Sequence, residues 1–124
     1  MIIDSDVIIE ILRGNAGTTA WLRRQRAAGA SLRYSPVTRA EIRAGARPKE
    51  RPVISALFAG MTATPIDASI ADLAGDQLAR YGRSHGVQMG DALIAASALE
   101  HSDELATFNL KHFPGVTKTI RPDR

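Results

Sequence analysis

Four oxygen-bearing side chains stand at the joints between apolar segments and the elements that follow them. They are Asp4 in MIIDSDVIIEILRG, Glu41 in SPVTRAEIRAG, Asp91 in MGDALIAASALE and Asn109 in LATFNLKHF. A carboxylate beside a core-forming segment is costly unless it is paired, hydrogen-bonded or bound to a metal. Oxygen ligands with few imidazoles and no thiolate favour Mg²⁺, with Mn²⁺ as a substitute, over zinc. This set therefore indicates metal-assisted phosphodiester chemistry.

Each of these residues also has a plain structural interpretation. Asp4 can be a turn residue after a strand, and Asp91 can be the N-cap of an apolar helix. Glu41 can close a capping box that begins at Thr38. Asn109 can be a turn or cap residue. The ordered combination, and not any one position, favours a common site.

Two further residues are auxiliary candidates. Asp6 stands two positions after Asp4 and can either reach the rim of the pocket or cap a helix. Thr107 can hydrogen-bond to the pocket from the end of a strand. The three histidines, His85, His101 and His112, show no metal-ligand spacing, so we expect them on the surface or in loops.

The cations are mostly arginines, in a chain with 16 Lys or Arg against 13 Asp or Glu and a formal net charge of +3. Arginine matches phosphate geometry bidentately and is common at nucleic-acid surfaces. Arg39 and Arg43 are the candidates nearest in sequence to Glu41, and Arg43 can stabilise a leaving oxygen. The alternative interpretation is that the arginines are solvated helix faces.

Apolar periodicity and turn residues predict strands that alternate with helices. The expected strands cover residues 1–4, 30–34, 62–66, 104–107 and 116–120. The expected helices cover residues 6–12, 18–28, 36–46, 53–58, 68–85 and 91–100. This alternation predicts one α/β domain, residues 1–124, whose parallel sheet is covered by helices on both faces. Ligands bind beyond the carboxyl ends of such strands, where Asp4 and Asn109 fall.

The remaining composition predicts a soluble, cytoplasmic protein. The chain has no cysteine, which is compatible with a reducing compartment. Its first residues include Asp4, Asp6 and Glu10, unlike a basic and then apolar signal peptide. No apolar run approaches the roughly 20 residues that span a bilayer, so no membrane partner is expected.

The four segments quoted above occur in the order and spacing of a known family. The chain resembles the PIN-domain ribonucleases, and most closely the VapC toxins of prokaryotic toxin–antitoxin pairs. The resemblance covers essentially the whole chain and implies a single PIN domain, a three-layer α/β/α fold with a central, mainly parallel sheet. It also implies that Asp4, Glu41 and Asp91 hold a divalent metal. Many relatives carry Asp where this chain has Asn109, which puts a second tightly held metal in doubt.

The resemblance implies an activity and partners as well. The implied activity is that of a Mg²⁺-dependent endoribonuclease toxin of a type II system, which cleaves structured RNA and inhibits translation and growth. Arg39 and Arg43 would then contact RNA. The implied partners are a small VapB-like antitoxin and a second copy of the chain. We expect the antitoxin to dock on exposed apolar residues of the early helices, with Trp21, Leu22 and Phe58 as candidates.

Two other classes remain open. A catalytically weak PIN domain could act mainly as a protein- or RNA-binding module, and Asn109 is the best argument for it. The pattern Asp4-Ser5-Asp6 also resembles the acid pair of haloacid-dehalogenase-type phosphatases. That family expects Gly-Thr soon after the second Asp, whereas Val7 and Ile8 follow here.

Overall fold

A five-stranded parallel sheet lies at the centre of the computed structural model, which describes residues 1–124. Each strand has only two residues: β1 (Ile2–Ile3), β2 (Arg33–Tyr34), β3 (Thr62–Ala63), β4 (Leu105–Ala106) and β5 (Thr119–Ile120). The strand order is β3-β2-β1-β4-β5, and every neighbouring pair is parallel. The first strand of the chain is therefore the central strand of the sheet.

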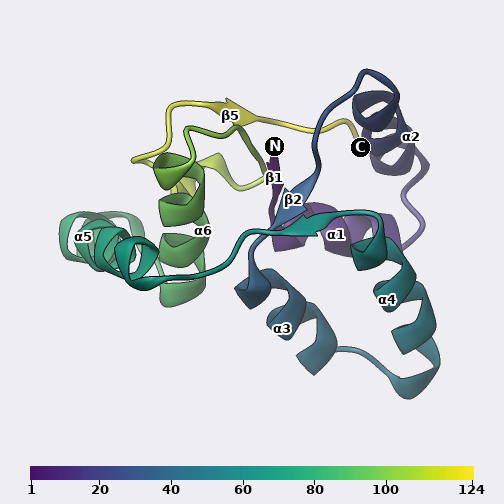
Figure 1. Ribbon diagram of the computed structural model, residues 1–124, viewed down its shortest axis with the longest axis horizontal. Helices are drawn as coiled ribbons and strands as arrows, with labels where there is room; N and C mark the ends of the chain where they lie inside the picture. Colours follow the sequence, from purple (N-terminus) through teal and green to yellow (C-terminus); the bar gives the residue numbers. More distant parts are fainter.

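Helices connect the strands (Figure 1). They are α1 (Ser5–Leu12), α2 (Ala16–Ala27), α3 (Pro36–Ala44), α4 (Arg51–Ala59), α5 (Ala68–His85) and α6 (Met89–Glu100), with 3₁₀ turns η1 (Pro48–Glu50) and η2 (Leu110–His112). None of these helices is long and apolar enough to cross a lipid bilayer.

The two faces of the sheet carry different helices. Ile3 and Ala106 point into a core shared with residues of α1, α2, α3 and α4. Ile2 and Leu105, one position away, point into a second core shared with α6. Successive strand residues face opposite sides of a sheet, so this split follows from the pleat. The predicted α/β/α layering is confirmed, with α5 packed on the outer side of α6 (Figure 1).

Local capping chemistry explains where several helices begin. Ser35 accepts a hydrogen bond from the Val37 amide at the start of α3, with Pro36 in the first turn. Asp67 accepts from the Ile70 amide at the start of α5. The predicted bounds 68–85 of α5 are confirmed, and Gly86 ends this helix in the left-handed conformation, with φ 64°.

The structure corrects two interpretations of the acidic residues. Helix α6 begins at Met89 with Gln88 as its N-cap, so Asp91 lies in the first turn and is not the cap. Helix α3 is capped by Ser35, so Glu41 does not close a capping box at Thr38. Glu41 lies past the middle of that helix, so its carboxylate does not cap the helix and is free to contribute to a site.

The expected docking residues of the early helices are also corrected. Trp21, Leu22 and Phe58 are only 5%, 4% and 1% exposed, and all three belong to the main core. Large apolar side chains on one face of an amphipathic helix fill the core first, since burial of each is worth about 1.5–3 kcal/mol. A partner cannot reach them on the folded chain.

The contact between α5 and α6 depends on small side chains. Ala74 of α5 and Ala92 and Ala96 of α6 are almost completely buried there.

We predict that Ala96→Leu lowers the free energy of unfolding by about 1–3 kcal/mol, because the added methylenes have no space. Urea denaturation measures this. Ala79→Leu on the exposed face of α5 is the matched control, and equal stability of the two variants would contradict this packing.

Candidate functional site

The carboxyl edge of the sheet brings the first and fourth strands together. Asp4 directly follows β1, and its amide donates to the Ala106 carbonyl of β4 over 2.9 Å. Thr107 directly follows β4. Because the two strands are parallel and in register, their next residues, Asp4 and Thr107, meet at this edge. The expected position beyond the strand ends is confirmed.

Asp4 is a buried carboxylate held by donors from Ser5 and Thr107. Its side chain is 5% exposed by residue area. Asp4 Oδ1 accepts from the Ser5 amide over 2.8 Å, which also caps α1. Asp4 Oδ2 accepts from the Thr107 hydroxyl over 2.8 Å, and Thr107 itself is fully buried. Thr107 therefore fixes the orientation of Asp4.

Asp6 joins the same network from the first turn of α1. Its Oδ2 accepts from the Phe108 amide over 3.0 Å and lies 3.3 Å from the Thr107 hydroxyl. Its Oδ1 is buried and has no hydrogen-bond partner. Of the two interpretations open for Asp6, the structure favours the pocket, since Asp4 caps the helix. An unpartnered buried carboxylate oxygen is costly and fits a place for a cation.

Glu41 and Asp91 approach this edge from two other elements. A side chain on Gly90 of α6 would place its Cβ 3.2 Å from Glu41 Oε1, so α3 and α6 come close here. Asp91 Oδ2 accepts from the Gln88 amide over 3.2 Å, within the first turn of α6. Glu41 makes no hydrogen bond and is exposed, whereas Asp91 is half-buried.

The carboxylates influence one another. Burial, and then the charges of Asp6 and Asp91, raise the pKa of Asp4 to about 7. Burial also raises the pKa of Asp6. For Glu41, partial burial and then the charge of Asp91 raise the pKa. Desolvation and like-charge repulsion both disfavour the ionised form, and a bound cation would remove that repulsion.

Asn109 has a partner that the sequence reasoning missed. Its Nδ2 lies 2.7 Å from His112 Nδ1, and His112 Nδ1 lies 3.7 Å from Asp91 Oδ2. His112 is partly exposed in a short turn, as expected, but it also contacts Asn109. The two residues are three apart in a 3₁₀ turn, which places them on one side. The Asn-X-X-His spacing was the available signal.

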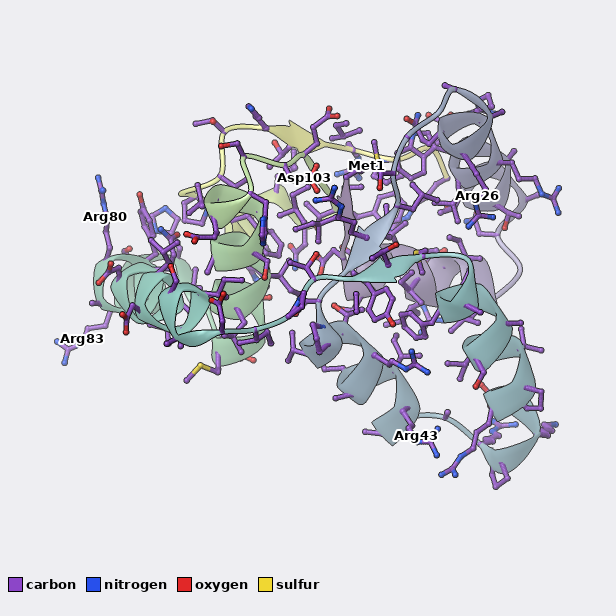
Figure 2. The ribbon with its side chains drawn as sticks, viewed as in Figure 1. Met1, Arg26, Arg43, Arg80, Arg83 and Asp103 are labelled. Atoms are coloured by element: carbon purple, nitrogen blue, oxygen red, sulfur yellow. The ribbon has the colours of Figure 1, made fainter.

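Arg39 and Arg43 do not surround the acidic edge. Arg39 and Arg43 are four residues apart on α3 and lie on the same face of the helix. Glu41 is two residues from each, which places its side chain about 200° away around the helix axis. Arg39 Nη1 donates to the Tyr34 hydroxyl over 2.8 Å, and its guanidinium lies over the Tyr34 and Phe58 rings. Figure 2 shows Arg43 at the far end of α3, on the side of α4. This placement does not support their proposed contact with RNA at the site.

The donor chemistry fits a hard divalent cation. Asp4 and Asp6 share Thr107 at this edge, the charge of Asp91 acts on both Asp4 and Glu41, and Asp6 Oδ1 lacks a partner. No three Asp, Glu or His side chains are close enough together to hold one ion as they stand. Thr107 and backbone amides fix Asp4 and Asp6, so an ion requires Glu41 and Asp91 to turn inward. Both have the solvent exposure that permits this.

The fold agrees with the comparison of the sequence to known families. The chain belongs to the PIN domain family, which it matches over residues 1–117. Within that family it is of the VapC type. It is 42% identical over 115 residues to Ribonuclease VapC10 of Mycobacterium tuberculosis, an alignment that covers 92% of this chain and 86% of that protein. It is 32% identical over 114 residues to Ribonuclease VapC19 of the same organism, with 91% of each chain covered.

Solved structures show the same architecture. A toxin–antitoxin complex from Klebsiella pneumoniae contains a chain with TM-score 0.80 and 21% identity, over 98% of this chain and 96% of that one. FitAcB from Neisseria gonorrhoeae gives TM-score 0.69 and 28% identity, with the same coverage. The resemblance stated from the sequence is thus confirmed, while the roles of the individual site residues stay predictions.

The raised pKa of Asp4 predicts how stability depends on pH without metal. Between about pH 4 and about pH 7 the folded chain holds a proton that the unfolded chain releases, so the unfolding free energy falls as pH rises. Asp4→Asn has no carboxyl group to titrate at this position, so its unfolding free energy does not fall for this reason as pH rises. We expect its stability relative to wild type to increase from about pH 4 to about pH 8 by a few kcal/mol. Urea denaturation in EDTA measures this, and parallel pH curves for the two proteins would contradict it.

Proposed function

We propose that this protein is a Mg²⁺-dependent endoribonuclease, the toxin of a type II toxin–antitoxin pair. In this proposal it acts in the cytoplasm, cleaves structured RNA by hydrolysis and so inhibits translation and growth. The observation that carries the proposal is the pair Asp4 and Asp6, held together at the carboxyl edge of a PIN domain sheet, with the charge of Asp91 acting on Asp4 and on Glu41. Relatives with 42% and 32% identity are named ribonucleases, which supports the choice of RNA as substrate.

Asp4, Glu41 and Asp91 would hold the ion, with Mn²⁺ as a substitute for Mg²⁺. When bound, the ion would neutralise the carboxylates, polarise the scissile phosphate and activate water for in-line attack on phosphorus. We expect products with a 5′-phosphate and a 3′-hydroxyl. Thr107 and the Ser5 amide hold the carboxylate of Asp4 in one orientation, and the Phe108 amide does the same for Asp6. This fixed pair reduces the reorganisation that metal and substrate binding require.

Asn109 would contribute without charge. Its amide nitrogen is oriented toward His112, which leaves its carbonyl oxygen as an acceptor at the rim of the site. A neutral ligand neutralises less of the charge of a second cation than Asp would. We therefore propose one firmly held ion.

The second candidate function is a catalytically weak PIN domain that mainly binds protein or RNA. Asn109 in place of a carboxylate, and the spread of the acidic side chains, favour it. Cleavage of RNA that depends on divalent metal would decide for the enzyme, and RNA binding without cleavage would decide for the binding module.

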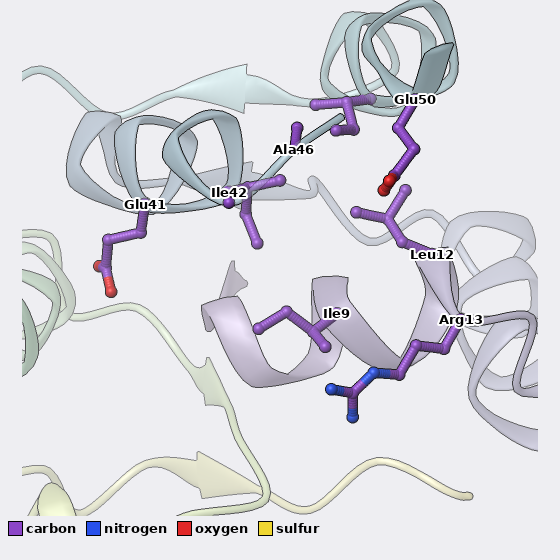
Figure 3. Close-up of a pocket in the computed structure, with 9 residues that line it drawn as sticks. Ile9, Leu12, Arg13, Glu41, Ile42, Ala46 and Glu50 are labelled. Carbon is purple, nitrogen blue, oxygen red and sulfur yellow. The ribbon is translucent and has the colours of Figure 1, made fainter. Parts of the chain in front are cut away.

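A groove beside the site suits the antitoxin. Ile9 and Leu12 of α1 face Ile42 and Ala46, with Glu41 at one end and Arg13 and Glu50 at the other (Figure 3). Its volume is about 290 Å³. An amphipathic helix can lay apolar side chains in such a groove and extend a following Arg or Lys toward Glu41. We propose this groove, in place of Trp21, Leu22 and Phe58, as the docking surface for a VapB-like partner.

The similar structure from Klebsiella pneumoniae is a toxin–antitoxin complex, which supports a partner of this kind. We also propose a homodimer for the toxin. Light scattering on the purified toxin and on its complex measures the number of copies.

Removal of one site charge tests the enzyme. We predict that Asp4→Asn and Asp91→Asn each reduce Mg²⁺-dependent RNA cleavage by about a hundredfold or more, because the amide keeps the shape and loses the charge that holds the ion. Cleavage of labelled RNA, with circular dichroism to verify folding, measures this. The matched control is Asp72→Asn on the exposed side of α5. Wild-type cleavage by Asp91→Asn would overturn the assignment.

A charge in the groove tests the partner surface. We predict that Ile9→Glu prevents copurification with the coexpressed antitoxin, because a buried carboxylate on an apolar contact is unfavourable. RNA cleavage by the isolated toxin should persist, released from inhibition. Ile66→Glu is the matched control, since Ile66 is 38% exposed and Ile9 is 37% exposed. Unchanged copurification of Ile9→Glu would place the antitoxin elsewhere.

A further inference from the structure

The segment that follows β5 returns to the acidic edge of the sheet. Strand β5 is parallel to β4, and the Thr107 amide donates to the Ile120 carbonyl over 3.0 Å. Arg121 therefore begins where Thr107 and Phe108 lie, beside the residues that hold Asp4 and Asp6. This is the same side on which parallel sheets bind their ligands.

Two guanidinium groups from this segment cover one aromatic ring. The central carbon of Arg121 lies 5.8 Å from the centre of the Phe108 ring, and that of Arg124 lies 4.2 Å from it. Arg121 Nη1 also donates to the Phe108 carbonyl over 3.1 Å. Both arginines are exposed. A guanidinium stacked on a ring through its face keeps its edge N–H groups for another acceptor.

These two cations have no anionic partner in the protein. Neither takes part in an ion pair, and the neighbouring Asp123 is paired with Arg24 instead. Arg39, in contrast, is engaged by Tyr34. Positive charge beside a cluster of carboxylates, but not neutralised by them, favours a further anion at this place.

The segment is held in place by α2. The Thr18 hydroxyl donates to the Asp123 carbonyl over 2.8 Å, and Pro122 is buried. A Cβ at Gly17 would collide with the Arg124 backbone, so only glycine permits this close approach. An anchored backbone lowers the entropy that the two arginines lose when they bind a ligand.

We propose that Arg121 and Arg124, stacked on Phe108, bind the phosphates of a single-stranded loop of the structured RNA, next to the phosphate that is cleaved. The proposal rests on the ribonuclease function and names the residues that position its substrate. Phe108 connects the two parts, because its amide holds Asp6 while its ring carries the arginines. Since these contacts are to phosphates, they add affinity without selecting a base sequence.

Binding of a labelled RNA tests this without cleavage. The probe is a 5′-fluorescein single-stranded oligouridine, titrated with the full chain in EDTA at several salt concentrations and followed by anisotropy. Each phosphate contact contributes a slope of about 0.7 in log K against log salt for single strands, or about fivefold at about 0.1 M salt. We expect Arg121→Ala with Arg124→Ala to weaken binding about 25-fold and to lower the slope by about 1.4.

Two controls separate charge from structure. The first is Arg80→Ala, since Arg80 also stacks on an aromatic ring, that of Tyr81 at 5.2 Å, but lies on the far side of α5 (Figure 2). It should bind RNA like wild type. The second is the double variant Arg121→Lys, Arg124→Lys, which retains both charges and should keep most of the salt slope.

The outcomes distinguish this proposal from the ribonuclease assignment. If the double alanine variant binds RNA as wild type does, or if wild type binds no oligouridine, the phosphate contacts are refuted whatever the cleavage assay shows. If Arg80→Ala loses as much affinity, the effect is one of general charge and the proposal is also refuted. Weaker binding only in the alanine double variant supports it, even if Mg²⁺-dependent cleavage is not found.

Discussion

The buried carboxylate of Asp4 is the constraint around which this structure is arranged. Removing a carboxylate from water is costly unless donors replace the lost hydration. Here the Ser5 amide supplies one donor as α1 begins, and the Thr107 hydroxyl supplies the other from the end of β4. The same residue thus caps a helix, closes the central strand pair and stands at the acidic edge. Asp6 and Asp91 then raise its pKa further, so the site is under electrostatic strain without a cation.

Much of the fold could be predicted because local signals agree with it. Ser35-Pro36 and Asp67 are strong helix starts, and α5 has a regular apolar stripe that ends in Gly86. Strand positions were correct, although each strand is shorter than expected. Strands β1 and β2 leave the sheet after two residues because helices begin one residue later, after the caps Asp4 and Ser35. The pattern of apolar residues indicates which residues are buried, but it does not show where the hydrogen-bonded pairing of two strands ends.

The errors share a cause, which is that a sequence does not show which face of a helix is covered. Phe58 and Trp21 were expected at a partner surface and fill the core instead. Arg39 is drawn away from the acidic edge by Tyr34, a partner five residues earlier. His112 contacts Asn109 through a 3₁₀ turn for which the apolar pattern gives no signal. The positions of Asp4 and Asp91 could be predicted, because Asp4 follows a strand and Asp91 lies in the first turn of a helix. Glu41 lies past the middle of α3, so no such local signal marks it.

The central place of β1 also determines when the acidic edge can form during synthesis. The first strand made needs β4 as a neighbour, and Asp4 needs Thr107 to orient it, yet about a hundred residues separate these partners. Contacts between distant residues form late in folding because the intervening loop must close first. A nascent chain on the ribosome therefore lacks the assembled acidic edge until β4 has emerged. The acidic edge is therefore one of the last features of the fold to assemble.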